Sequence, residues 1–224
     1  MRSPLAKSLS VAALSVIATT ASAQDFTNGP AIGLGLGTLG ITGEISQKLG
    51  TNFVGRLNGS WLGIDLDRDV DGNNYAIKAR AYGAGLTADW HPFANGFRLS
   101  AGVRYHVADF KGSIGAGDIE LDGTTYTQAQ YGRLNARLEN GNRVAPYLGI
   151  GFDSSHFKTG NWSFASEIGV LYVGDPKVSL SATNAGAIPG LQADLDAEAA
   201  SIRSEYGKFG RFWPVIQFSA KYRF

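Results

Sequence analysis

The chain has 224 residues with 20 Lys and Arg against 19 Asp and Glu, so a basic surface for nucleic acid is not expected. It has no cysteine, which excludes disulfides, thiolate metal sites and thiol nucleophiles. Its 30 glycines are about twice the usual share, and its mean hydropathy of −0.07 is too low for a bundle of membrane helices.

The N-terminus has the pattern of a cleaved secretory signal. Arg2 and Lys7 give a positive start, residues 9–18 form a short apolar run, and Ala21-Ser22-Ala23 fits the small-x-small cleavage site. Such a run is too short for a membrane helix, which needs about 20 apolar residues. We expect a signal peptide over 1–23 and one mature domain over 24–224.

The mature sequence is a series of runs with one apolar and one polar face, and turns rich in Gly, Asn, Asp and Pro separate them. Strand side chains point alternately to opposite faces, so a two-residue period predicts half-buried strands. In the last run, Ile216, Phe218 and Tyr222 share one face, and Gln217 and Lys221 share the other. A soluble sandwich also alternates, but the aromatic ends of the apolar faces favour an antiparallel transmembrane up-and-down β-barrel.

The runs predict strands over 52–66, 75–90, 97–110, 131–139, 145–153, 162–173, 177–184 and 212–224. Residues 31–48 change parity at Thr38-Leu39-Gly40, which either a tight hairpin or a β-bulge explains. The hairpin is favoured because it gives an even count of about 10 strands; 8 strands is the alternative if a weak run lies outside the wall. Segments 49–51, 91–96, 139–143 and 174–176 are expected as short periplasmic turns, and 67–74, 111–130 and 153–161 as outside loops.

One segment departs from this period. Leu191, Leu195, Ala199, Ile202 and Tyr206 recur at helical spacing, and acidic residues crowd the first half of the segment, where the helix dipole favours them. We expect an amphipathic helix over 190–206, just before the last strand and on the outer side of the membrane.

The polar strand faces gather charge toward one lumen. In a narrow barrel these side chains form either a filled interior of ion pairs or a small channel that prefers anions, and the filled interior is favoured. The predicted lumen-lining residues are Glu44, Arg56, Arg98, Arg104, Arg133, Arg137, Glu139, Glu167, Lys177, Lys221 and Arg223.

Other motifs give weaker hypotheses. Residues 67–72 have the D-x-D-x-D-G spacing of a calcium loop, but Lys78, at position twelve, stands where that loop needs a bidentate Glu, so a solvated acidic loop is favoured. If the loop binds calcium, the expected ligands are Asp65, Asp67, Asp69 and Asp71. The G-x-G-x-x-G match over 35–40 has no helix after it, so no cofactor is expected. A lipid-modifying hydrolase built on Ser155-His156 and Glu167 ranks third among the possible functions, and no catalytic residue or enzymatic activity is expected.

Several stretches resemble a group of uncharacterised Gram-negative outer-membrane proteins with a small β-barrel domain. The resemblance lies in DWHPF at 89–93, APYLGIG at 145–151, GDPKVSL at 174–180 and the acidic helix followed by FWPV at 212–215. It implies an outer-membrane location and a barrel fold rather than an activity. From the sequence as a whole we expect a structural or surface-interaction role, with a narrow channel for small solutes as the alternative. Phe218, Tyr222 and Phe224 resemble a C-terminal assembly signal. The expected partners are outer-membrane lipid, lipopolysaccharide, the barrel assembly machinery and periplasmic chaperones; the oligomeric state stays open.

Overall fold

The computed structural model describes residues 29–70, 73–115, 117–121 and 123–224, without the side chains of 68–70 and 73–75. The predicted signal over 1–23 lies outside these residues, as do Asp71 and the side chain of Asp69. None of the helices in the described part of the chain is long and apolar enough to cross a membrane.

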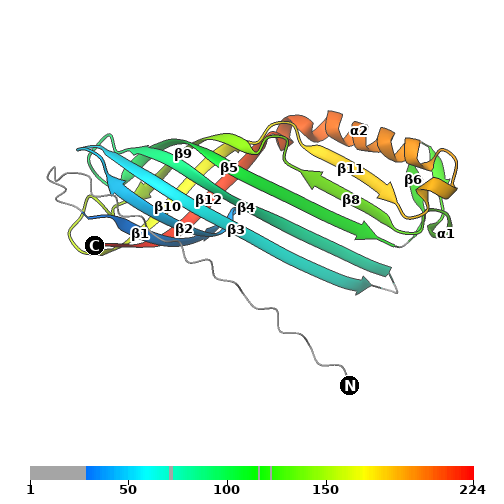
Figure 1. Cartoon of the computed structure of the whole chain (residues 1–224), viewed down its shortest axis with the longest axis horizontal. Helices are drawn as coiled ribbons and strands as arrows, with labels where there is room; N and C mark the ends of the chain where they lie inside the picture. The colour runs from blue at the N-terminus through cyan, green and yellow to red at the C-terminus, as the bar shows by residue number, and fades with distance from the viewer. Residues whose placement is uncertain (1–28, 71–72, 116, 122) are drawn as a thin grey trace, which may run out of the picture.

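In the described part of the chain, eight antiparallel strands close into a barrel (Figure 1). Pairing of β12 with β1 and of β9 with β5 completes the ring. In order round the wall the strands are β1 (Ala31–Gly37), β2 (Gly40–Lys48), β3 (Phe53–Val70), β4 (Asn73–Trp90), β5 (Phe97–Ile114), β9 (Val144–Asp153), β10 (Trp162–Tyr172) and β12 (Phe212–Arg223).

Three wall strands, β3, β4 and β5, have 18 residues each and run past the barrel. There β5 pairs with β8 (Leu134–Glu139), which pairs with β11 (Lys177–Ala182). We name this five-stranded open sheet the extension; α2 (Leu191–Gly210) lies on it in Figure 1. Four short elements complete it, namely β6 (Ile119–Leu121), β7 (Thr124–Tyr126), α1 (Gln128–Tyr131) and a 3-10 turn (Ala185–Ala187).

The end of the barrel where β1 begins and β12 finishes is named the terminal end, and the opposite end the extended end. The predicted turns near 49–51 and 91–96 lie at the terminal end, and residues 117–121 and 123–133 lie at the extended end, where β3 finishes and β4 begins. The β1–β2 connection is the predicted hairpin: Gly37 pairs with Gly40, whose φ of +83° favours glycine.

The alternative of eight wall strands is correct, and two of the ten predicted strands lie outside the closed wall. β8 pairs with Asp109–Ile114 of β5, and β9 pairs with Phe97–Tyr105 of the same strand. β8 and β9 therefore follow one another along the same edge of β5 and run in the same direction. Between them, the Asn140 side chain accepts from Ala108 N (2.7 Å) and donates to His106 O (2.9 Å). The chain therefore keeps its direction at 139–143, and likewise at 174–176 between β10 and β11. The two periplasmic turns predicted there are wrong.

The loop at 153–161 is another correction. It was expected on the outer side, but Phe152 pairs with Phe97, which places the loop at the terminal end beside the turn at 91–96. The error follows from the missing reversal at 139–143, which inverts the direction of β9. Ser155 and His156 are buried there, and Arg223 Nη1 donates to Ser155 O at 3.0 Å.

The two faces of the long strands exchange character where they leave the barrel. Within the barrel, the outward face of β3 carries Leu57 and Trp61 and the inward face carries Arg56 and Asn58. Beyond Trp61 the outward face is charged and the inward face is apolar. One row of paired residues on the outward face consists of Asp65, Lys78, Lys111 and Arg137. The neighbouring row on the inward face consists of Ile64, Ala79, Phe110, Leu138 and Val178.

The helix α2 covers part of this apolar inward face. Leu191 and Leu195 are fully buried and pack with Leu180 of β11 and Leu134 of β8. The prediction of an amphipathic helix before the last strand is confirmed, although α2 continues to Gly210. The extension is thus a sheet with a charged outward face and a partly covered apolar inward face, joined to a barrel of opposite polarity.

Candidate functional site in the barrel interior

Seven charged side chains meet across the barrel interior and are named the ionic layer. They come from seven of the eight wall strands: Glu44 on β2, Arg56 on β3, Asp89 on β4, Arg98 on β5, Asp153 on β9, Glu167 on β10 and Lys221 on β12. All seven point inward because each lies on the polar parity of its strand.

The two arginines form the centre of the ionic layer. Arg56 Nε lies 3.0 Å from Asp89 Oδ2, and Arg56 Nη2 lies 2.6 Å from Glu167 Oε2. Arg98 Nη2 lies 2.5 Å from the same Glu167 oxygen, and its Nη1 contacts Asp89 at 3.2 Å and Asp153 at 3.1 Å. Forked guanidinium groups suit this arrangement because each presents several donors in one plane.

Lys221 extends the layer to the opposite side of the wall. Its Nζ lies 2.5 Å from Asp153 Oδ2 and 2.7 Å from Glu44 Oε1, and the residue is fully buried. Neutral donors complete the carboxylates: Tyr147 donates to Glu167 at 2.5 Å and Ser100 donates to Asp89 at 2.6 Å. Each carboxylate of the layer therefore forms at least one ion pair, and Glu167 and Asp89 also accept a hydrogen bond from a hydroxyl group.

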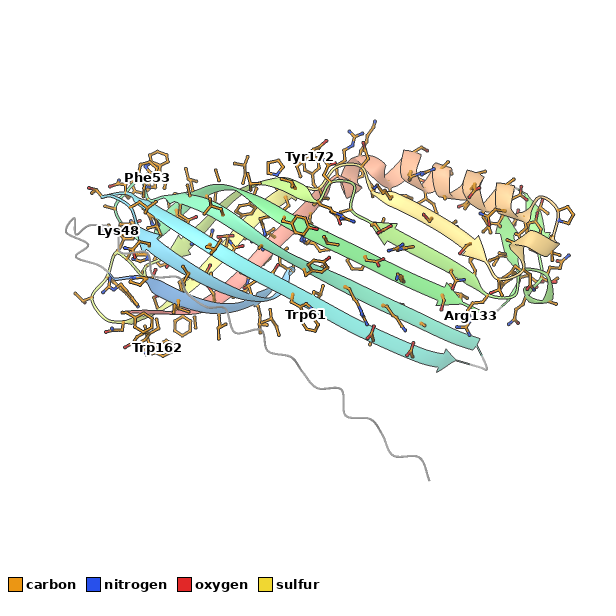
Figure 2. All side chains as sticks on the ribbon, viewed as in Figure 1. Lys48, Phe53, Trp61, Arg133, Trp162 and Tyr172 are labelled. Atoms are coloured by element: carbon orange, nitrogen blue, oxygen red, sulfur yellow. The ribbon has the colours of Figure 1, made fainter. Side chains whose placement is uncertain are left out.

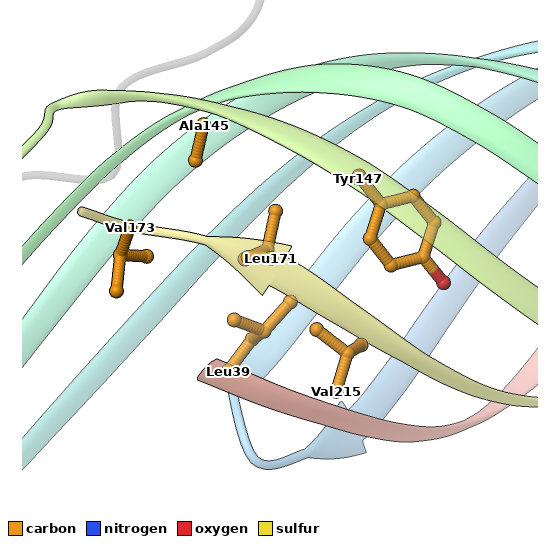
Figure 3. Packing of buried hydrophobic residues seen from close by; sticks show 6 residues of the cluster. All are labelled: Leu39, Ala145, Tyr147, Leu171, Val173 and Val215. Atoms are coloured by element: carbon orange, nitrogen blue, oxygen red, sulfur yellow. The ribbon is translucent and has the colours of Figure 1, made fainter. Parts of the chain in front are cut away.

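A cluster of buried apolar side chains lies on the β9–β10–β12 side of the interior (Figure 3). Leu171 and Val173 pack with Val215 and with Leu39 from the β1–β2 turn, and the Tyr147 ring joins them. Trp213 is packed against this cluster. Side chains of both kinds therefore occupy the interior, as an eight-stranded barrel requires.

The interior of β3–β5 toward the extended end has a different character. Arg104 is buried and its Nη2 donates to Ser60 Oγ at 3.2 Å. Among the described residues, Arg104 Nε, both ring nitrogens of His106, Asn58 Oδ1 and Thr87 Oγ1 have no hydrogen-bond partner. Buried polar atoms without protein partners usually bind water or a ligand.

Six of the eleven predicted lumen residues lie inside the barrel, namely Glu44, Arg56, Arg98, Arg104, Glu167 and Lys221. Arg223 lies at the terminal end. Arg133, Arg137, Glu139 and Lys177 lie on the extension and not in the lumen, because β8 and β11 are outside the closed wall. Arg137, for example, is paired with Asp109 on the outward face, with Nε 2.9 Å from Oδ1.

Two of the four acids of the ionic layer, Asp89 and Asp153, were not among the predicted lumen residues. Asp89 shares strand parity with the inward Thr87, so the two-residue period alone could have placed it inside. Asp153 is the last residue of β9. It was not predicted to face the lumen because it was expected at the start of an outside loop.

The other candidate residues do not form a common site. Asp65 Oδ2 accepts from Arg80 Nη2 at 3.4 Å, and a search of the described residues finds no group of three or more His, Asp or Glu arranged to hold a metal. His156 Nε2 is 3.1 Å from Ser46 Oγ, whereas the partners of Glu167 are Arg56, Arg98 and Tyr147. Of the C-terminal aromatics, Phe218 and Phe224 are exposed and Tyr222 packs edge to face on Trp162.

The fold is similar to two crystal structures of Acinetobacter baumannii proteins. CarO2 superposes with a TM-score of 0.63 at 23% identity, covering 88% of this chain and 99% of that chain. CarO superposes with a TM-score of 0.62 at 21% identity, covering 90% of this chain and 100% of that chain. No family model and no curated protein matches the sequence. At these identities the likeness establishes a shared barrel fold.

Proposed function

We propose that the chain is an integral outer-membrane β-barrel protein with a structural or surface-interaction role, and that its ionic layer closes the lumen. In this proposal the extension stands outside the cell and carries the interactions, and the protein has no catalytic role. The observation that carries the proposal is the apolar belt on the outside of a barrel whose inside is charged.

The belt surrounds the wall. Leu34 on β1 is 69% exposed, Leu86 on β4 is 66% exposed and Phe164 on β10 is 79% exposed. Burying one such side chain stabilises a protein by about 1.5–3 kcal/mol, so a ring of them in water would be strongly unfavourable. A hydrocarbon environment removes that cost and supports a membrane location.

The height of the belt fits a bilayer. On β3 it extends from Phe53 to Trp61, which is about the nine residues that a tilted membrane strand needs. Figure 2 places Phe53 and Trp162 toward the terminal end and Trp61 and Tyr172 where the barrel passes into the extension. Aromatic side chains at both edges are typical of membrane interfaces.

The connections support the orientation. Residues 49–52 and 91–96 are short connections at the terminal end, whereas the long outer parts of β3 and β4, residues 117–121 and 123–133, and α2 lie at the extended end. Outer-membrane barrels keep short turns in the periplasm and larger elements outside. The exposed aromatic Phe224 at the end of β12 supports recognition by the barrel assembly machinery in the periplasm.

A second function, a narrow channel for small solutes that include anions, has one observation in its favour. Arg104, His106 and their neighbours hold polar atoms without protein partners, and waters bound there would form a polar path from the ionic layer toward the extended end, beside the apolar cluster. Movement of that layer would then open an arginine-lined path, which favours anions.

Conductance of the refolded, signal-free protein in planar bilayers separates the two functions. A heat-dependent shift on gels is the control, because it reports a folded barrel independently of conductance. A folded protein that inserts without current steps supports the closed scaffold. Discrete steps with anion selectivity would replace it with the channel, and failure to insert would overturn the membrane proposal itself.

A further inference from the structure

We propose that a cationic groove on the outward face of the extension binds the phosphate groups of lipopolysaccharide in the adjoining leaflet. The groove has a volume of about 690 Å³ and its cations are Lys78, Lys111, Arg133 and Arg137. This inference rests on the proposed function, since it takes the extension to stand outside the outer membrane.

The strand register aligns the cations of the groove. Lys78 of β4 is opposite Lys111 of β5, and Lys111 is opposite Arg137 of β8. Opposite residues in neighbouring strands have Cβ atoms about 5 Å apart, so three cations from three strands form one row. Arg133, just before β8, lines the same groove closer to its far end, where Figure 2 labels it.

The charge in the groove is unbalanced. The one carboxylate that lines it in the described part of the chain is Asp67, against four cations. Asp109 is the next outward residue of β5 toward the barrel, and it forms ion pairs with Arg137 and Lys111. The hydrogen bond from Arg137 holds the pKa of Asp109 below its usual range. Lys78 and Arg133 have no ion pair among the described side chains, so two cations remain for a ligand.

The groove stands at the height of lipid headgroups. The last apolar row of the belt consists of Trp61, Tyr82 and Val107, and Lys78 and Lys111 are the second outward residues beyond it on β4 and β5. Four residues of strand at about 3.3 Å each, tilted by about 40°, rise about 10 Å above that row. Polar headgroups occupy the zone immediately above the hydrocarbon.

The lining suits a phosphorylated glycolipid better than a free anion. Ser113, Ser179 and Ser181 add hydroxyl groups beside the cations, which suits hydrogen bonding to sugar and phosphate oxygens. The groove is open and its lysines are exposed, so a free phosphate would gain little from them in water. A lipid held in the leaflet meets the same cations at high effective concentration, and basic residues near the membrane surface attract anionic lipid.

The test uses the refolded protein in neutral detergent and counts bound lipid A by native mass spectrometry during a titration. The groove variant is K78Q/K111Q, and the matched control is K158Q/K208Q, which removes the same charge from two exposed lysines elsewhere. We expect the groove variant to bind lipid A about tenfold more weakly than the native chain, and the control to match the native chain. Dephosphorylated lipid A should bind all three proteins equally weakly.

Two results would overturn the groove proposal. One is equal binding of lipid A by the groove variant and the native chain when both show the heat-dependent gel shift. The other is displacement of lipid A by inorganic phosphate at micromolar concentration, which would assign the groove to a free anion. A separate experiment tests the proposed function, which places the extension outside the cell. If that placement is wrong, a protease site inserted at 185–188 would resist external protease in intact cells.

Discussion

Arg98 and Glu167 are 69 positions apart in the chain, yet Arg98 Nη2 lies 2.5 Å from Glu167 Oε2 inside the barrel. The same carboxylate oxygen also contacts Arg56, so one acid joins β3, β5 and β10 across the interior. Neither arginine is exposed, and each depends on this carboxylate for part of its charge compensation.

Removing this shared acid should destabilise the folded barrel. In Glu167→Ala two buried guanidinium groups lose a partner, and breaking a buried ion pair by removing one member costs about 3–5 kcal/mol. The temperature of the gel shift in detergent measures the effect. Glu139→Ala is the control because Glu139 lies on the extension; equal shifts for both variants would contradict the central role of Glu167.

Opening the layer should open the lumen. The variant D89A/R98A removes one acid and one cation, so the net charge is kept while the contacts from β4 and β5 to the layer are lost. We expect current steps in planar bilayers from this variant and none from the native chain. The pair D109A/R137A, which removes an ion pair on the extension, should stay silent, and steps from it would mean that conductance does not depend on the ionic layer.

Two glycines of α2 should respond in opposite ways to alanine. A Cβ at Gly207 would meet no atom within 4 Å, whereas a Cβ at Gly210 would lie 2.8 Å from Pro176 Cγ. Alanine is favoured over glycine in a helix by about 0.8–1 kcal/mol, so Gly207→Ala should slow hydrogen exchange of α2 amides severalfold. Gly210→Ala should leave exchange unchanged or speed it. The reverse order would show that α2 does not pack on Pro176 as described.

Acid should loosen the loop at 153–161 before it unfolds the barrel. Burial lowers the pKa of His156 to about 4, and nearby Lys221, Arg223 and Lys48 act in the same direction, whereas Asp153 raises it. The unfolded chain, with a histidine pKa near 6.5, binds a proton first, so stability from this residue falls as pH drops from about 6.5 to 4.

The corresponding variant is His156→Gln, whose side-chain amide can still hydrogen-bond to Ser46 Oγ but does not titrate. We expect limited proteolysis within 154–161 to accelerate between pH 6.5 and 4 in the native chain and to change less in the variant. His91 also has a pKa lowered by burial and stacks on Phe157, so H91Q/H156Q should flatten the profile further. A native profile that is already flat over this range would contradict the prediction.

The strand periodicity allowed much of the fold to be predicted from the sequence. Both faces of β12, the hairpin at Thr38 and the helix before the last strand follow from local patterns of two or 3.6 residues. The number of wall strands could not be predicted from these patterns. A short polar segment interrupts an alternating run in the same way whether the chain reverses direction there or continues. At Asn140 the chain continues in the same direction because the side chain hydrogen-bonds to the backbone of β5, which is distant in the sequence.

The candidate site was predictable only to the same extent. Parity placed Arg56, Arg98 and Glu167 inside, but it could not tell which runs belong to the closed wall, so Arg137 and Lys177 were expected in the lumen. Their alternation is the same as that of wall residues. In the extension the polar residues of this alternation lie on the outward face, whereas in the wall they lie on the inward face.

The position of α2 in the chain links two steps of assembly. The helix that covers the apolar face of the extension is followed directly by β12, the strand that seals the ring against β1. If the strands assemble in chain order, the apolar face under α2 stays uncovered until α2 forms, directly before β12 closes the ring. A chain truncated before Leu191 would lack both, and would leave an open sheet edge and an uncovered apolar surface exposed together.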